Sequence, residues 1–409
     1  MSTNDQFKYS DLSLSITKSI SKKDKKDFGI FFTPPNTIYH NIELISDYIT
    51  DGINILEPSC GSGEYISQIH KLYPNSKIKG IEFNEQIFNK ISDMNNLDNI
   101  TIINNDFLSY NDSTKYDLII GNPPYFVMKK NDVDVKYHDY FDGRPNIFIL
   151  FLIKCLNMLN DEGILSFVLP RNFLNSLYYN KTREFIDKNY TIVDIVEIED
   201  NYIETQQDTV IVIIQKTNNV NNEQNGEFIL YKKEFTIFMQ TDNLDKTHTL
   251  LANSKTLDDL NFNVSVGKVV WNQKKAILTD DSTKTRLIYS SDIIDNKLSM
   301  KSYKSATKKN YIDMDGFNEA TLVINRGYGK GAYKFSYAII NINKSYQIEN
   351  HLIEIKSNNN NSKASLLDLY NKIILSLNDP RTTQFIDIYF GNNAINTTEL
   401  AHILPIYGL

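Results

Sequence analysis

The stretch ILEPSCGSGEY at residues 55–65 decides the fold of the first half of the chain. Residues 54–56 read as a short buried strand, and a helical pattern of apolar residues begins after the turn that holds Gly61 and Gly63. Glycines allow a tight turn and let a ligand come close to the backbone. We therefore expect the first strand and helix of an α/β sheet, with a ligand site where that strand ends.

Strands and helices continue to alternate beyond this stretch. Strand-like runs occur at 77–83, 101–104, 116–121, 164–169, 192–198 and 209–215. A nearly continuous apolar segment at 146–159 is long enough for a buried helix. This alternation predicts a mainly parallel, Rossmann-like α/β sheet with helices on both faces. The last two runs have no clear helix between them, so one of them can be antiparallel.

Acidic residues stand at the ends of the first three expected strands. Glu57 ends the first strand, Glu82 the second and Asp106 the third. In such sheets these ends share one crevice, where an acidic side chain accepts hydrogen bonds from ribose hydroxyls. The chain has neither a GxGxxG turn nor a Walker lysine, and three carboxylates suit a pyrophosphate poorly. A cationic ligand that carries an adenosine, such as S-adenosylmethionine, fits this charge better than a dinucleotide does.

The tetrapeptide Asn122-Pro123-Pro124-Tyr125 follows the fourth expected strand. Its prolines fix the backbone and lack N–H donors, which directs the Asn122 side chain and the Pro123 carbonyl outward as acceptors. Two acceptors that bind the N–H groups of a planar amino group draw it towards a tetrahedral geometry and localise its lone pair. The nitrogen can then attack the methyl group of a sulfonium directly. This chemistry needs positioning and electrostatics, but no metal and no covalent enzyme intermediate.

With these motifs the chain resembles the class I S-adenosylmethionine-dependent methyltransferases. Within them it is similar to the gamma-class N6-adenine DNA methyltransferases of the TaqI and Eco57I type. The motifs that carry the resemblance are FFTPP (31–35), ILEPSCGSGEY (55–65), GIEFN (80–84), NNDFLSY (104–110), YDLIIGNPPY (116–125) and GILSFVLPRNFL (163–174). The resemblance implies S-adenosylmethionine as the cofactor and an adenine of double-stranded DNA as the substrate.

The resemblance also implies roles for single residues. Glu82 would bind the ribose of the cofactor, and Asp106 would bind its adenine amino group. The other expected cofactor residues are Thr33, Glu57, Ser59, Gly61, Phe83, Phe107 and Asn122. A target base flipped out of the duplex would be held by Asn122, Pro123 and Tyr125. Tyr202 would stack on the other face of that base, although the family more often has phenylalanine at this place.

The chain is expected to have three parts. Residues 1–27 are a polar N-terminal arm, residues 28–226 the catalytic domain, and residues 227–409 an α+β domain that the family's layout makes a DNA target-recognition domain. Two segments of this last part mix basic, amide and aromatic groups, as base and phosphate contacts require. The candidate DNA-binding residues are Trp271, Asn272, Lys274, Arg326, Tyr328 and Lys330. An exposed polar loop is the alternative for either segment.

Composition excludes several classes of protein. The 409 residues are 41% hydrophobic and 23% charged, which is globular and neither fibrous nor fully disordered. Two cysteines cannot form a disulfide framework, and the six histidines show no metal-ligand spacing. No apolar run is long enough for a membrane span. We expect an intracellular protein without a metal site. The net charge of −7 neither demands nor excludes DNA.

These observations predict a site-specific DNA adenine-N6 methyltransferase that acts as a monomer. It would be the modification enzyme of a restriction–modification system, beside a cognate endonuclease for the same site, or an orphan enzyme. Two alternatives stay open. One is a protein-glutamine N5 or ribosomal-RNA adenine methyltransferase, which usually lacks so large a second domain. The other is a catalytically silent DNA-binding module, against which the intact tetrapeptide and the three acids argue.

Overall fold

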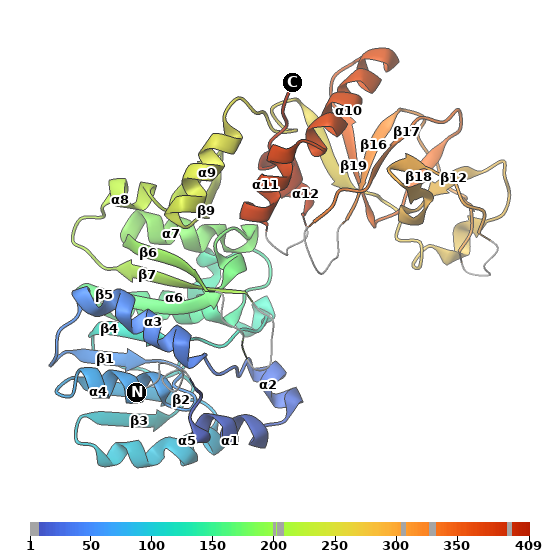
Figure 1. Cartoon of the computed structure of the whole chain (residues 1–409). Coiled ribbons are helices and arrows are strands. Elements are labelled where there is room, and N and C mark those ends of the chain that lie inside the picture. Colours follow the sequence, from blue (N-terminus) through green and yellow to red (C-terminus); the bar gives the residue numbers. More distant parts are fainter. Residues whose placement is uncertain (1–7, 199–201, 203–207, 304–307, 327–332, 391–394) are drawn as a thin grey trace. The chain divides into compact units, whose positions relative to one another are not determined.

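The computed structural model describes residues 8–198, 202, 208–303, 308–326, 333–390 and 395–409. The chain divides into two compact units, Met1–Leu244 and Asp245–Leu409 (Figure 1). The first unit carries the large sheet expected from the sequence, and the second combines smaller sheets with helices.

A seven-stranded sheet forms the centre of the first unit. The strand order is β3-β2-β1-β4-β5-β7-β6, and β7 is antiparallel to both of its neighbours while the other pairs are parallel. The strands are β1 (Asn54–Glu57), β2 (Lys77–Glu82), β3 (Ile100–Asn104), β4 (Tyr116–Gly121), β5 (Leu159–Pro170), β6 (Thr191–Ile198) and β7 (Thr209–Gln215). The predicted sheet is confirmed, including one antiparallel strand among the last two.

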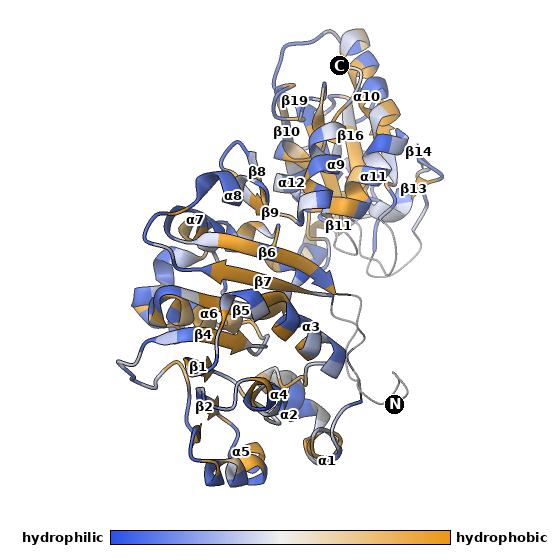
Figure 2. Ribbon diagram, turned by 60° about the vertical axis from the view of Figure 1, so that its left-hand side comes forward, coloured by the Kyte–Doolittle hydropathy of each residue, from blue (hydrophilic) through white to orange (hydrophobic). Residues whose placement is uncertain are grey.

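Helices pack on both faces of this sheet. Successive strand residues point to opposite faces, so Ile119 joins the core under α6 and α7, whereas Leu118 joins the core under α3 and α4. A strand that is buried on both faces reads as a continuous apolar run, and Figure 2 shows this hydrophobic colour along β7. The helices are α3 (Pro35–Ile45), α4 (Glu64–Leu72), α5 (Glu85–Ile91), α6 (Ile147–Met158) and α7 (Asn180–Asn189).

The expectation of a polar arm at residues 1–27 is wrong for residues 8–27, which the structure describes. Residues 8–28 contain helices α1 (Asp11–Ser19) and α2 (Lys22–Phe28), which belong to the first unit. Ile16 is fully buried in a small core with Ile20 and Phe32. The Ser13 hydroxyl donates a hydrogen bond of 2.7 Å to the Ser62 hydroxyl in the glycine turn. The spacing of Ile16 and Ile20 by four residues was the sequence signal for this buried face.

The expected domain boundary after residue 226 is also displaced, to Leu244. Helix α8 (Asn222–Gly226) is followed by a hairpin of β8 (Ile229–Lys232) and β9 (Phe235–Phe238). Phe228, Ile229 and Phe238 are part of the core of the first unit. The linker-like composition of residues 217–226 therefore marks a turn within the unit, because the apolar residues after it still pack on the first core.

The second unit contains two four-stranded sheets, in the orders β10-β19-β16-β17 and β11-β15-β12-β18, and a hairpin of β13 and β14. Helix α9 (Thr241–Leu251) crosses the boundary between the units. The α+β class expected for this part is confirmed. Its elements are β10 (Phe262–Val266), β11 (Leu278–Thr279), β12 (Thr285–Ile288), β13 (Ile293–Ile294), β14 (Lys297–Leu298), β15 (Tyr311–Ile312), β16 (Thr321–Asn325), β17 (Tyr337–Ile340), β18 (Tyr346–Ile348), β19 (Leu352–Ser357), α10 (Lys363–Leu377), α11 (Pro380–Tyr389) and α12 (Thr397–His402).

Arg183 provides a test of how the hairpin is attached. This arginine is fully buried and donates hydrogen bonds to the carbonyls of Thr236, Phe173 and Ser176. We expect Arg183→Met to lower the free energy of unfolding by about 3 kcal/mol or more, because buried carbonyls lose a charged donor. Urea unfolding of the full chain measures this. Lys181→Gln, an exposed change on the same helix, should shift it by no more than about 0.5 kcal/mol.

Candidate active site

A cavity of about 300 Å³ lies at the carboxyl edge of β1, β2, β3 and β4. The turns that follow these four strands bring together residues that are far apart in the sequence. Thr33, Glu57, Pro123, Tyr125 and Tyr202 do not line the cavity. The expected site residues that line it are Ser59, Gly61, Glu82, Phe83, Asp106, Phe107 and Asn122.

The Glu82 carboxylate links the turns that follow β1 and β2. It accepts hydrogen bonds from the backbone N–H of Gly61 at 2.8 Å and from that of Asn84 at 2.7 Å. Gly61 adopts a left-handed φ of 50°, which a glycine tolerates without strain. Glu82 is buried, and its burial raises the pKa of this carboxyl to about 7. Further hydrogen-bond donors in the cavity would favour the ionised form.

Aromatic rings form two parts of the cavity wall. The buried ring of Phe107 packs against Phe151 with ring centroids 4.9 Å apart. Phe83 is 61% exposed, and its ring lies 6.0 Å from that of Phe28. Phe28 was not expected at the site, although it stands three residues before the FFTPP motif. Asp106 lies beside these rings and accepts a hydrogen bond from the Leu108 N–H at 3.0 Å.

Asn122 is held from several sides. Its side-chain Nδ2 donates to the Thr33 hydroxyl at 3.0 Å, and its Oδ1 accepts a hydrogen bond from the Tyr125 hydroxyl. The Ser59 hydroxyl donates to its backbone carbonyl at 3.3 Å. The Tyr125 hydroxyl also lies 2.7 Å from the carbonyl oxygen of Val168. Because this hydroxyl has one proton and two acceptors, it can bond to Val168 alone and leave Asn122 Oδ1 to accept from another group.

Gly29 connects the N-terminal helices to this tetrapeptide. It ends α2 with a left-handed φ of 63°. A Cβ atom at this position would lie 2.7 Å from the backbone nitrogen of Tyr125, which is closer than real Cβ contacts come. Residues that follow α2 therefore pack directly on the backbone of the Asn-Pro-Pro-Tyr segment, and a larger residue than glycine would displace it.

Tyr202 lies near two other tyrosines of the first unit. It is 7% exposed. Burial raises the pKa of the Tyr125 hydroxyl, and the nearby Tyr202 and Tyr65 hydroxyls raise it further. The structure thus brings Tyr202 into the surroundings of Tyr125, although it does not line the cavity.

The expected DNA-binding residues lie in the second unit. Asn272 and Lys274 are exposed, whereas Trp271 is half-buried against the core around Val269. Arg326 follows β16, and its backbone N–H donates to the carbonyl of His351 at 3.1 Å. Tyr328 and Lys330 lie outside the described residues.

Comparisons with known proteins identify the family. The family model of the Eco57I restriction-modification methylases matches residues 6–203. The Type II methyltransferase M.CvrRI of Paramecium bursaria Chlorella virus XZ-6E is 30% identical over 410 residues, covering 98% of this chain and 99% of that protein. The chain belongs to this family of restriction-modification DNA methyltransferases.

Two further similarities involve only part of the methyltransferase. The modification methylase CviBIII of Paramecium bursaria Chlorella virus NC1A is 36% identical over 184 residues, 44% of this chain and 47% of its own length. Among solved structures, the methyltransferase subunit of a type I restriction-modification system from Streptococcus thermophilus is 17% identical, with a TM-score of 0.40. That alignment covers 58% of this chain and 57% of the other.

Membership of the family makes this chain a DNA methyltransferase of the class I fold, with S-adenosylmethionine as its methyl donor. Within the described residues, no helix is long and apolar enough to cross a membrane. The same residues contain no group of three or more side chains that could hold a metal ion.

Residues that line the cavity, and Glu57 next to the lining residue Pro58, fit this cofactor. Glu57 Oε2 is buried and has no hydrogen-bond partner among the described residues. Burial raises the pKa of Glu57 well above its usual range, and the nearby carboxylates of Glu82 and Glu64 raise it further. A cationic amino group would supply the partner that this carboxylate lacks. Glu82 would accept from the ribose hydroxyls, and Asp106 would accept from the adenine amino group beside Phe107.

Lys154 is a second residue that was not expected at the site. It is the single charged residue of helix α6, and its ammonium group donates hydrogen bonds to the carbonyls of Phe107, Leu108 and Tyr110. The same ammonium lies 4.6 Å from the centroid of the Phe107 ring. Lys154 therefore fixes the turn that carries Asp106 and Phe107 into the cavity. A lone lysine in an otherwise apolar helix was the available signal.

Replacing Lys154 should affect cofactor binding more than turnover. We expect Lys154→Met to weaken S-adenosylmethionine binding about tenfold, because the turn that carries Asp106 loses its three bonds, equivalent to about 1.4 kcal/mol. Calorimetry and steady-state kinetics would show a raised KM for the cofactor with a smaller change in kcat. Lys79→Met is the matched control, since Lys79 pairs with Asp112 further along the same loop. Equal effects of both variants would mean that Lys154 only stabilises the fold.

The pKa of Glu82 gives a pH test of cofactor binding. Burial raises this pKa to about 7, and the ionised form is the better acceptor for ribose hydroxyls. We therefore expect affinity for S-adenosylmethionine to be constant above pH 7 and to fall below it, approaching about tenfold for each pH unit. Calorimetry over a pH series measures this. Glu82→Gln should bind more weakly at high pH and should lose this dependence, and a pH profile that is unchanged in Glu82→Gln would contradict the assignment.

Proposed function

We propose that this DNA methyltransferase is site-specific and methylates the N6 amino group of an adenine flipped out of double-stranded DNA. The observation that supports this most strongly is the position of Asn122. It begins an Asn-Pro-Pro-Tyr segment and lines the same cavity as Glu82 and Asp106. The residue proposed to accept the amino group and the residues proposed to bind the cofactor therefore line a single cavity.

Asn122 Oδ1 and the Pro123 carbonyl would accept the two N–H groups of the adenine amino group. S-adenosylmethionine supplies the methyl group on a positively charged sulfur. The adenine nitrogen would take this methyl group and lose one proton, and the electron pair of the broken carbon–sulfur bond would stay on sulfur. Thr33 holds the Asn122 amide in the orientation that directs Oδ1 away from the Thr33 hydroxyl. The chain thus contributes orientation and two acceptors to this step.

Tyr125 would have two roles in this reaction. Its ring would stack on one face of the flipped base, with Tyr202 on the other face. Its hydroxyl bonds to Asn122 Oδ1 and has the Val168 carbonyl as a second acceptor. Transfer of this hydrogen bond to Val168 would release Oδ1 when the base enters. Aromatic stacking and two hydrogen bonds would offset the few kcal/mol that flipping costs.

The second unit would recognise the target sequence, with Arg326 and the Trp271–Lys274 segment as candidate contacts. The full-length similarity to M.CvrRI includes this unit, which favours DNA over the protein-glutamine and ribosomal-RNA alternatives. We propose that the enzyme works as a monomer inside the cell that contains its DNA. It would act either beside a cognate endonuclease or as an orphan.

The variant Asn122→Ala tests the catalytic assignment. We expect methyl transfer to duplex DNA to fall by about a hundredfold or more, because one acceptor for the amino group is lost, as for removal of one oxyanion-hole donor. Binding of S-adenosylmethionine, measured by calorimetry, should change little. Asn105→Ala is the control, because Asn105 also lines the cavity but lies after β3. Near-normal turnover of Asn122→Ala would contradict the mechanism.

A further inference from the structure

Positive charge is concentrated in one stretch of the second unit. Residues 268–312 hold ten lysines and arginines against four aspartates and no glutamate, in a chain whose net charge is −7. This stretch includes β11, β12 and β15 of one sheet and the hairpin of β13 and β14. A basic region within an acidic protein is the electrostatic signature of a surface that binds nucleic acid.

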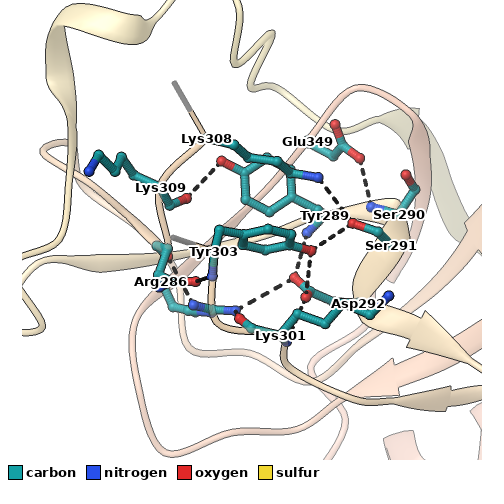
Figure 3. A network of polar contacts seen from close by, with 11 residues as sticks. Arg286, Tyr289, Ser290, Ser291, Asp292, Lys301, Tyr303, Lys308, Lys309 and Glu349 are labelled. Carbon is teal, nitrogen blue, oxygen red and sulfur yellow. Dashed lines mark hydrogen bonds and ion pairs between the residues drawn. The ribbon is translucent and has the colours of Figure 1, made fainter. Parts of the chain in front are cut away.

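A buried network holds the backbone at Lys301 and Asn310, within the basic stretch (Figure 3). Asp292 is fully buried, and its carboxylate accepts from the backbone N–H of Lys301 at 2.9 Å and from the Tyr303 hydroxyl at 2.9 Å. Arg286 lies 3.7 Å from this carboxylate and donates to the carbonyls of Lys301 and Asn310. The backbone at Lys301 and at Asn310 is therefore held by one buried ion pair, Arg286–Asp292.

Aromatic rings position a lysine on the same network. The Lys308 ammonium lies 4.1 Å from the ring centroid of Tyr289 and 4.3 Å from that of Tyr303 (Figure 3). It also donates to the Ser291 hydroxyl at 3.0 Å. The Tyr289 hydroxyl in turn donates to the Lys309 carbonyl at 2.8 Å. Lys308 is half-buried, and these contacts hold its ammonium group within the network.

Two more lysines of this region are exposed. The side chains of Lys297, in β14, and Lys301 are both solvent-exposed, while the Lys301 backbone takes part in the network. Lys309 is different, because its ammonium pairs with Asp280 at 2.5 Å. Lys297 and Lys301 therefore present exposed cations beside this network, whereas the Lys308 ammonium is engaged within it.

We propose that the exposed Lys297 and Lys301 belong to a phosphate-binding surface for the backbone of duplex DNA. The inference rests on the proposed function, since it requires duplex DNA as the substrate. Lysine on phosphate gives affinity without sequence preference. This surface would position the duplex, whereas the reading of bases is left to other residues of the second unit. The buried Arg286–Asp292 pair would hold the Lys301 backbone in place.

The test measures binding of the full chain to a short duplex of mixed sequence at several salt concentrations. Each phosphate contact contributes about 0.9 to the slope of log K against log salt. We expect Lys301→Gln to lower this slope by about 0.9 and to weaken binding at low salt, and Lys297→Gln to act in the same way. Lys363→Gln, an exposed change at the start of α10 in the same unit, removes the same charge and should leave the slope unchanged.

Further readouts separate this inference from the proposed function. The melting temperature and the affinity for S-adenosylmethionine should not change in Lys301→Gln, because its exposed side chain leaves the buried network intact. Lys301→Gln should also methylate the same DNA sequence motif as the unaltered chain. If Lys297→Gln and Lys301→Gln bind duplex DNA with the slope of the unaltered chain, or if Lys363→Gln lowers the slope equally, the surface is misassigned. If the unaltered chain methylates no adenine, the proposed function fails instead.

Discussion

The Glu82 carboxylate accepts the backbone N–H groups of Gly61 and Asn84, which belong to turns after two different strands. This shared acceptor fixes the glycine turn relative to the start of α5, so Ser59 and Phe83 line one cavity. The burial that makes the link possible also raises the pKa of Glu82 to about 7. The two backbone hydrogen bonds therefore do not fully compensate the Glu82 carboxylate for its loss of water. A ligand with hydroxyl donors would supply further hydrogen bonds to it.

Catalytic geometry depends on a segment that precedes the sheet. Thr33 bonds to the Asn122 side chain, and Gly29 packs on the backbone of Tyr125. Phe28 comes from the same segment and lines the cavity. The end of α2 and the residues that follow it thus border the candidate site rather than form an arm. This one segment therefore contacts both the proposed cofactor cavity and the Asn-Pro-Pro-Tyr segment.

The sheet and the strand-end acids were predictable because both follow local rules: apolar runs mark buried strands, and the acids stand where strands end. The packing of Ile16, the attachment of the β8–β9 hairpin and the role of Lys154 were not predicted, because each depends on contacts between distant segments. Thr33 was expected at the cofactor, whereas its visible contact is with Asn122. The second unit could be assigned to a class but not to a topology, since its strands are short and pair over long separations.

Asn122 and Pro123 are proposed to present an adenine amino group to the methyl donor. The most direct measurement incubates the purified chain with duplex DNA and isotope-labelled S-adenosylmethionine and then analyses the nucleosides by mass spectrometry. We expect the label in N6-methyldeoxyadenosine, and we expect the Asn122→Ala variant to lose this labelling. Label in N4-methyldeoxycytidine or 5-methyldeoxycytidine, or adenine labelling that survives in Asn122→Ala, would contradict it.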